Sequence, residues 1–347
     1  MRRDSNAERS DGDLLQRFRA GDVRALARAI SLAERRDPGA RKLEASLRDR
    51  ARRPYVIGFT GAPGTGKSTL VDALVALLRK QDMSVAIIAT DPNSPFTGGA
   101  ILGDRIRMQR HALDPKVFIR SMGARGHLGG LSLAARETIR LLGAFGFDVV
   151  IVETVGVGQS ELEVAAVADT TVVVLTPNLG DGVQMIKAGI LEIADLFVVN
   201  KADLDGHQRV LMDLRSMLSL GRASPRGEVQ SSSRVRDWKQ MIVSTSATEQ
   251  KGIDVLWAAV EAHRHYLETS GRGRHRAEQR LKEEAVEVVT ELARERAWDV
   301  LDGDAELTEK LIERGTPRAA AEEILQRVGT EAPGHARSHL RKRGPRG

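Results

Sequence analysis

The stretch from Gly61 to Ser68 has the residue types and spacing of a phosphate-binding loop. Its residues Gly61, Ala62, Pro63, Gly64, Thr65, Gly66, Lys67 and Ser68 match the pattern G-x-x-x-x-G-K-[ST], and Thr69 follows them. Glycines adopt backbone conformations that other residues avoid, so successive N–H groups can converge on phosphate oxygens at the positive end of a following helix. We expect Lys67 to reach the β- and γ-phosphates and Ser68 to offer a hydroxyl to Mg²⁺. The alternative is a glycine-rich turn that binds no ligand, but it would leave the presence of Lys67 and Ser68 in this pattern as a coincidence.

A second motif, Asn200-Lys201-Ala202-Asp203, matches the pattern N-K-x-D and predicts recognition of guanine. The Asp203 carboxylate can accept two hydrogen bonds, from guanine N1–H and from the 2-amino group, which adenine does not offer in that arrangement. We expect Asn200 to complement the major-groove edge of the base and the Lys201 stem to lie along the ring. Further along, Ser246-Ala247 follows an apolar run, and a backbone N–H there can bind the guanine carbonyl.

Two acidic residues end apolar runs and are candidates for a magnesium site. Glu153 begins Glu153-Thr154-Val155-Gly156, where we expect a carboxylate directed at Mg²⁺ and a glycine N–H that senses the γ-phosphate. Asp91 follows the apolar residues 84–90, and an acid at the carboxyl end of such a strand points into the ligand crevice. The loop from Asp91 to Asp104 either orders over a γ-phosphate or is a surface loop in which both acids cap helices.

The elements that position these motifs alternate between strands and helices. Apolar runs predict strands at residues 55–59, 84–90, 117–120, 147–152, 171–176, 196–199 and 241–245. Amphipathic segments at 69–78 and 129–142 predict helices between some of them. This alternation predicts an α/β fold of the P-loop NTPase type, with a doubly wound, mostly parallel sheet and helical extensions at both ends.

The 347 residues can form two domains, or one nucleotide-binding domain with helical additions. Residues 1–10 are polar and are expected to be disordered, while leucine and alanine recur at helical spacing from 12 to 50. Helices are also expected at 279–298 and, as a pair broken near Gly315, at 305–328. We predict an N-terminal helical extension at 1–52, a P-loop GTPase domain at 53–270, a C-terminal helical dimerisation extension at 271–334 and a basic disordered tail at 335–347.

Composition excludes several kinds of site. With no cysteine, the chain has no disulfide, thiolate metal site or cysteine nucleophile, which suits a reducing cytoplasm. We expect no signal peptide and no span long enough to cross a bilayer, and therefore a cytoplasmic protein with no membrane partner. The net charge is +6, but basic residues concentrate in the tail and only 3% of residues are aromatic, so we expect no nucleic-acid partner.

Five strings taken together resemble one family closely, the MeaB/MMAA-type GTPases, which also carry the names ArgK and LAO/AO transport ATPase. The strings are Arg19–Ile30, Gly61–Ser68, Thr90–Arg105, Glu153–Glu161 and Asn200–Asp203. The resemblance extends from about Leu14 to Ala259. The strings Asp91–Arg105 and Glu153–Glu161 are long and highly specific, and a generic P-loop protein would not carry both.

The resemblance implies a Mg²⁺-dependent GTPase, binding GTP or GDP, that acts as a chaperone of an adenosylcobalamin-dependent acyl-CoA mutase. Such a protein gates cobalamin loading, protects or reactivates the mutase, hydrolyses GTP slowly by itself and forms a homodimer. The residues carried over are Lys67, Asp104, Glu153 and Lys187 for catalysis and Ser68, Asp91, Asp104 and Glu153 for the metal. Lys187 alone would be an ordinary exposed helical lysine; the resemblance places it in a third switch that senses the partner. Leu179 departs from the glycine or alanine usual in that switch.

Two other functions use the same kind of loop. A nickel-type metallochaperone GTPase would need a cluster of histidines or cysteines, whereas cysteine is absent and the histidines are scattered at His207, His263, His265 and His275. A P-loop ATPase of the transport or partitioning type would carry a lysine just after the first glycine of the loop, where this chain has Ala62. The sequence leaves the identity of the mutase and of any catalytic base open.

Overall fold

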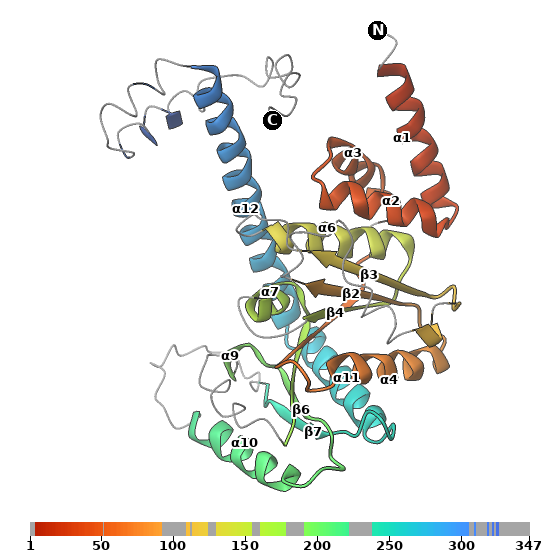
Figure 1. Cartoon of the computed structure of the whole chain (residues 1–347), viewed down its shortest axis with the longest axis vertical. Coiled ribbons are helices and arrows are strands. Elements are labelled where there is room, and N and C mark those ends of the chain that lie inside the picture. Colours follow the sequence, from red (N-terminus) through yellow and green to blue (C-terminus); the bar gives the residue numbers. More distant parts are fainter. Residues whose placement is uncertain are drawn as a thin grey trace, which may run out of the picture. The chain divides into compact units, whose positions relative to one another are not determined.

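A seven-stranded parallel sheet forms the centre of the protein (Figure 1). The computed structural model describes residues 4–50, 52–91, 109–111, 113–123, 130–154, 160–177, 191–221 and 238–304, and a few positions between 309 and 325. The strands are β1 (Tyr55–Thr60), β2 (Val85–Asp91), β3 (Val117–Gly123), β4 (Val149–Thr154), β5 (Thr170–Leu175), β6 (Leu196–Val199) and β7 (Met241–Ser244). Their order is β3-β2-β4-β1-β5-β6-β7 with parallel pairing throughout, which confirms the predicted doubly wound α/β fold.

The central strands are buried on both faces, as their sequences require. β1, β4 and β5 read YVIGFT, VVIVET and TTVVVL, and apart from the half-buried Tyr55 all their residues are buried. In a parallel sheet the carboxyl ends of all strands lie at one edge. Because Phe59 of β1 lies opposite Glu153 of β4, the phosphate loop and the acidic motif leave the sheet side by side. β6 also ends at this edge, one residue before Asn200.

Helices cover both faces of the sheet (Figure 1). One face packs against α6 (Gly130–Phe145), α7 (Ser160–Val167) and α10 (His207–Gly221), and the other against α4 (Lys67–Lys80) and α11 (Ile253–Thr269). Alternate strand residues serve the two faces, because successive side chains of a strand point to opposite sides. Thus Val172 and Val174 join the core under α4 and α11, while Val173 and Leu175 join the core under α10. The short helices are η1 (Arg48–Arg50), η2 (Gln109–His111) and α9 (Leu191–Ile193).

Three N-terminal helices, α1 (Asp4–Arg19), α2 (Val23–Glu34) and α3 (Pro38–Ser46), pack outside α6. Phe18 meets Phe145 of α6 edge-on, with 5.3 Å between the ring centroids. Asp22 and Asp37 cap α2 and α3 by accepting backbone N–H groups. Since α1 begins at Asp4, the prediction of disorder is wrong for residues 4–10, and residues 1–3 lie outside the described part of the chain. Extending a helix that is already anchored by Phe18 requires no new nucleation, so even a polar segment can continue it.

The C-terminal helix α12 (Arg272–Gly303) is one continuous helix, longer at both ends than the predicted 279–298. Contacts divide the chain into two compact units, Met1–Arg280 and Leu281–Gly347, so the first turns of α12 belong with the sheet. The predicted domain boundaries remain predictions, and most of the predicted pair at 305–328 and all of the tail lie outside the described residues. In the described part of the chain, no helix is both long and apolar enough to cross a membrane.

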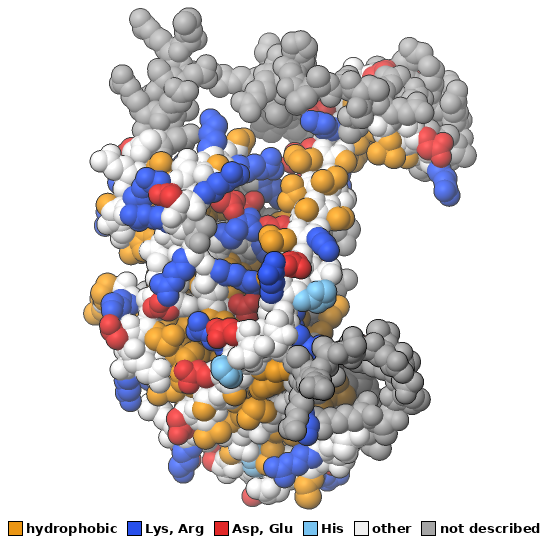
Figure 2. All heavy atoms as spheres, turned by 180° about the vertical axis from the view of Figure 1, so that it is seen from behind, with side chains coloured by type: hydrophobic (Ala, Val, Ile, Leu, Met, Phe, Trp, Pro, Cys, Tyr) orange, Lys and Arg blue, Asp and Glu red, His pale blue; other side chains and the backbone are white. Residues whose placement is uncertain are grey.

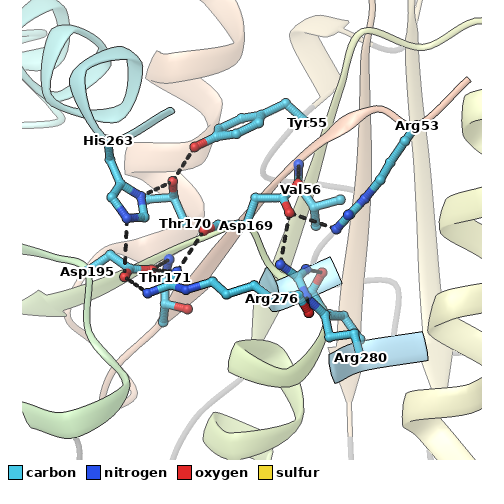
Figure 3. A network of polar contacts seen from close by, with 11 residues as sticks. Arg53, Tyr55, Val56, Asp169, Thr170, Thr171, Asp195, His263, Arg276 and Arg280 are labelled. Carbon is cyan, nitrogen blue, oxygen red and sulfur yellow. Dashed lines mark hydrogen bonds and ion pairs between the residues drawn. The ribbon is translucent and has the colours of Figure 1, made fainter. Parts of the chain in front are cut away.

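A polar network anchors the first turns of α12 at the amino-terminal edge of the sheet (Figure 3). Asp169, just before β5, accepts hydrogen bonds from Arg53 at 2.7 Å and from Arg280 at 3.1 Å. Asp195, just before β6, accepts one from Arg276 at 2.9 Å. Both aspartates are buried, so their charges need these partners. The network lies at the edge of the sheet opposite to the phosphate loop.

Candidate functional site

The phosphate loop connects β1 to α4, and two of its glycines combine a positive φ with no room for a side chain. Gly61 has a φ of 139° and Gly66 a φ of 85°, in the region that favours glycine. A Cβ on Gly61 would lie 2.3 Å from the Val174 carbonyl oxygen, and one on Gly66 would lie 2.6 Å from Asn200 Nδ2. Because α4 begins at Lys67, the loop lies at the positive end of the helix dipole. This geometry can hold an anionic group.

Lys67 is buried, and its ammonium lies against the loop. Its Nζ donates hydrogen bonds to the carbonyl oxygens of Gly61 at 2.6 Å and Ala62 at 3.0 Å. Thr65 Oγ1 donates to the same Ala62 oxygen at 2.9 Å. Pro63 and Gly64 are exposed at the tip of the loop, and Thr69 is exposed on α4. A cation fixed in this way can offset negative charge on phosphate oxygens.

Ser68 and Glu153 meet beside the loop. Ser68 Oγ donates to Glu153 Oε1 at 2.6 Å, and the Glu153 side chain is buried at the end of β4. Thr90 of β2 donates to the Glu153 carbonyl oxygen at 3.1 Å, which fixes the backbone at this point. A hydroxyl and a carboxylate are the hard oxygen ligands that Mg²⁺ prefers, so the pair fits a magnesium ion. When bound there, Mg²⁺ would neutralise charge on the β- and γ-phosphates.

Of the other predicted metal and switch residues, the structure describes only Asp91, and only its backbone. Asp91 ends β2 opposite Gly123 of β3, at the same edge as Glu153. Asp104, Gly156 and Lys187 lie outside the described residues. Their roles stay predictions.

Asn200 joins three segments of the site. Its side chain is buried, with 1% exposed, and Nδ2 donates to the Thr65 carbonyl oxygen at 2.9 Å. Its Oδ1 accepts from Thr245 Oγ1 at 3.0 Å and from Ala247 N at 3.2 Å. The sequence assigned Asn200 to the edge of the base, and these contacts connect the phosphate loop with both segments that are predicted to bind guanine. Asn200 therefore sets the distance between the phosphate loop and the predicted base site.

Lys201 and Asp203 lie toward solvent in the same motif. Lys201 Nζ donates to the Gly64 carbonyl oxygen at 2.9 Å, a second link to the phosphate loop. Asp203 Oδ1 accepts from Ser246 Oγ at 2.7 Å. This hydroxyl, a backbone N–H and the nearby Lys201 lower the pKa of Asp203 below its usual value. An ionised carboxylate with lone pairs still available can accept two N–H groups from a guanine ring.

Thr245 is a site residue that sequence reasoning missed, because it was assigned to the strand at 241–245. β7 ends at Ser244, and Thr245 is buried with its hydroxyl on Asn200. Its backbone also pairs with the guanine motif, since Ala202 N donates to the Thr245 carbonyl oxygen at 2.9 Å. A hydroxyl directly before Ser246-Ala247 is the signal that could have found it.

Among the residues that the structure describes, no group of three or more His, Cys, Asp or Glu side chains is arranged to hold a metal ion. The Ser68–Glu153 pair supplies two oxygen ligands. This is typical of Mg²⁺, which usually keeps several waters and binds through one or two carboxylates together with phosphates of the substrate.

Comparisons with known proteins agree with this geometry. The family model "Methylmalonyl Co-A mutase-associated GTPase MeaB" matches residues 26–301. A protein of Pyrococcus abyssi that is named as a GTPase is 44% identical over 318 residues, which cover 91% of this chain and 90% of that protein. GTPase ArgK of Escherichia coli is 42% identical over 263 residues, covering 74% and 77% of the two chains. The crystal structure of an LAO/AO transport system kinase is 29% identical with a TM-score of 0.64, covering 93% of this chain and 99% of that one.

Proposed function

The chain belongs to the MeaB family of GTP-hydrolysing P-loop enzymes, and we propose that its GTPase cycle serves an adenosylcobalamin-dependent acyl-CoA mutase. The observation that carries this proposal is the match to a mutase-associated GTPase family across residues 26–301. The contacts of Asn200 and Lys201 with the phosphate loop support it, because they hold a base site and a phosphate site in one fixed arrangement.

In this proposal the nucleotide and its Mg²⁺ bind at the carboxyl edge of the sheet. Asp203 recognises guanine, and Lys67 stabilises charge on the γ-phosphoryl oxygens while water attacks in line. The nucleotide ligands are Gly61, Ala62, Pro63, Gly64, Thr65, Gly66, Lys67, Ser68, Thr69, Gly156, Asn200, Lys201, Asp203, Ser246 and Ala247. The Mg²⁺ ligands and their neighbours are Ser68, Asp91, Asp104 and Glu153, of which the last two also take part in catalysis.

We propose that loss of the γ-phosphate is communicated to the mutase and gates its loading with cobalamin. Lys187 belongs to the segment that senses the partner. The family description names a methylmalonyl-CoA mutase, and the long strings at Thr90–Arg105 and Glu153–Glu161 support the same assignment. Slow hydrolysis by the protein alone is expected if the mutase completes the catalytic arrangement.

We also propose that the chain forms a homodimer through α12. From Leu281 onward this helix exposes large apolar side chains, which are visible as a hydrophobic strip in Figure 2. Leu281, Val288 and Leu292 are spaced by seven and four residues, so they share one face of the helix, and Val289 lies beside them. Val289 is 64% exposed. A contiguous apolar strip on an otherwise charged helix is typical of an interaction surface.

Isothermal titration calorimetry tests the nucleotide part of this proposal. We expect GDP and a non-hydrolysable GTP analogue to bind, the analogue more tightly with Mg²⁺ than with EDTA, and the corresponding ATP analogue to bind far more weakly. Lys67→Ala should weaken binding of the GTP analogue by about a hundredfold or more, and Lys80→Ala, at the exposed far end of the same helix, serves as the matched control. Preference for ATP would overturn the assignment of guanine.

Rates of GTP hydrolysis with purified mutases test the partner. We expect one member of the methylmalonyl-, isobutyryl-, ethylmalonyl- and hydroxyisobutyryl-CoA mutase group to accelerate hydrolysis and to be loaded with cobalamin only when GTP is present. Lys187→Ala should reduce the acceleration and leave nucleotide affinity unchanged, whereas exposed Lys42→Ala on α3 should change neither. Indifference to every such mutase, with normal GTP binding, would refute the partner and leave the GTPase in place.

A further inference from the structure

His207 links the two chain segments assigned to the guanine base, and we propose that it is a positioning residue for guanine recognition. It is the first residue of α10, and its Nε2 lies 3.0 Å from Ser244 Oγ at the end of β7. The imidazole is buried, with 8% exposed, and in the described part of the chain its Nδ1 has no hydrogen-bond partner. Ser244 is therefore the hydrogen-bond partner of this imidazole within the described residues. This role rests on the proposed function of Asp203 as the guanine ligand.

His207 and Ser244 lie next to the two segments assigned to guanine, which are Asn200–Asp203 and Ser246–Ala247. His207 follows Asp203 by four positions, and Ser244 comes two positions before Ser246. On the other side of the motif the segments are already joined, because Ala202 N donates to the Thr245 carbonyl oxygen. The hydrogen bond between His207 and Ser244 is thus a second link between the two segments, and Asp203 lies in the chain between the two links.

Within the described residues, backbone conformation and hydrogen bonds of the main chain define the turn between Asp203 and α10. Leu204 N donates to the Lys201 carbonyl oxygen, and Gly206 adopts a φ of 86°. Within the described residues, no side-chain hydrogen bond comes from positions 204–206, so His207 is the first side chain after Asp203 that ties this turn to β7. Loss of its hydrogen bond would let the turn move relative to Ser246 and carry the Asp203 carboxylate with it.

Guanine recognition is sensitive to such a movement because hydrogen bonds weaken steeply as their angles depart from linear. GDP and IDP differ only in the 2-amino group, which donates one hydrogen bond to the Asp203 carboxylate in the proposed arrangement. A hydrogen bond to a charged acceptor corresponds to a preference of roughly tenfold to a hundredfold. The ratio of the GDP and IDP affinities therefore reports the position of Asp203, while phosphate binding cancels out.

Displacement of a fluorescent GDP analogue by GDP and by IDP, both with Mg²⁺, measures this ratio. Because Ser246 also holds Asp203, we expect His207→Leu and Ser244→Ala to lower the ratio by about threefold to tenfold rather than to abolish it. His207→Gln places an amide N–H near the position of Nε2 and should keep the ratio within about twofold of the wild-type value. Leu211→Ala is the matched control, since Leu211 is buried one turn along α10 and its truncation weakens packing without removing the bond to Ser244.

Three results would overturn the proposal. His207→Leu could weaken GDP and IDP equally, as Leu211→Ala should, which would make His207 a structural residue only. His207→Gln could lower the ratio as much as His207→Leu, or Ser244→Ala could leave it unchanged; either result would remove the bond to Ser244 as the cause. If His207→Leu fails to fold, the variants Ser244→Ala and His207→Gln still test whether the hydrogen bond between His207 and Ser244 sets the ratio. A wild-type protein that does not distinguish GDP from IDP would instead refute the role of Asp203.

Discussion

The buried imidazole of His263 should make the stability of the protein depend on pH (Figure 3). His263 in α11 is fully buried; its Nδ1 lies 2.7 Å from Thr170 Oγ1, and its Nε2 lies 3.4 Å from Asp195 Oδ1. Burial lowers the pKa of His263 from its usual 6.5 to about 4, and nearby Arg276 adds to this effect, although the Asp195 carboxylate opposes it. The folded protein therefore keeps this ring neutral over a range in which the unfolded chain protonates it.

The size of the effect follows from the two pKa values. Between pH 6.5 and about pH 4 the unfolded chain binds a proton that the folded chain excludes, so the free energy of unfolding decreases as the pH decreases. The contribution of His263 to the free energy of unfolding is fully present above pH 6.5 and is lost as the pH falls toward 4. At about 1.36 kcal/mol per pKa unit, the loss between pH 7.5 and pH 4.5 is about 2–3 kcal/mol from His263.

Urea unfolding at pH 7.5 and at pH 4.5 measures this loss in the wild type and in His263→Asn. The asparagine amide can still form a hydrogen bond with Thr170 Oγ1 but does not take up a proton. The loss between the two pH values should thus be smaller in the variant by about 2–3 kcal/mol, while carboxylate contributions cancel in the comparison. His265→Asn, an exposed position on the same helix, should behave like the wild type. Equal losses in the wild type and in His263→Asn would refute the reasoning.

Three further changes test other parts of the chain. Lys67→Ala should weaken GTP binding by about a hundredfold or more in calorimetry, because it removes the cation of the phosphate loop. Arg280→Ala should lower the free energy of unfolding by about 1–3 kcal/mol, because it takes a partner from buried Asp169; Arg274→Ala, with its side chain 88% exposed, should cost less than about 0.5 kcal/mol in the same urea experiment. Val289→Glu should shift the mass found by light scattering from dimer toward monomer, since it puts a charge into the apolar strip. Unchanged GTP affinity in Lys67→Ala would contradict the role of the lysine. Equal effects of the two arginine variants would contradict the role of Arg280. A monomeric wild type would contradict the proposed dimer.

The sheet could be predicted because its signals are local. An uninterrupted apolar run such as TTVVVL is typical of a strand that is buried on both faces. The expected strand at 171–176 differs from β5 by one residue at each end. The motifs could be predicted for the same reason, since G-x-x-x-x-G-K-[ST] and N-K-x-D each encode their chemistry within a few adjacent residues. The family that these strings resemble is the one whose model matches the chain.

The contacts between motifs could not be predicted in this way, because they join residues far apart in the chain. Asn200 and Thr65 are 135 positions apart, and their hydrogen bond exists only because β1 and β6 end at the same edge of the sheet. Nothing in the pattern N-K-x-D says that the asparagine amide is occupied by the phosphate loop. The ion pairs of α12 were missed for the same reason, since Arg280 is 111 positions from Asp169.

Substitutions of polar groups at the two edges of the sheet should have different effects, because the two edges lie far apart. β6 carries Asp195 before its first residue and Asn200 after its last, and the five residue-to-residue steps between them, at about 3.3 Å each, separate the edges by roughly 16 Å. A packed parallel strand does not bend easily over this length, because its hydrogen bonds to β5 and β7 fix its register. Substitutions at Arg280 or His263 should therefore change stability and leave the GDP to IDP ratio intact. Substitution of His207, which lies at the same edge as Asp203, should change the ratio.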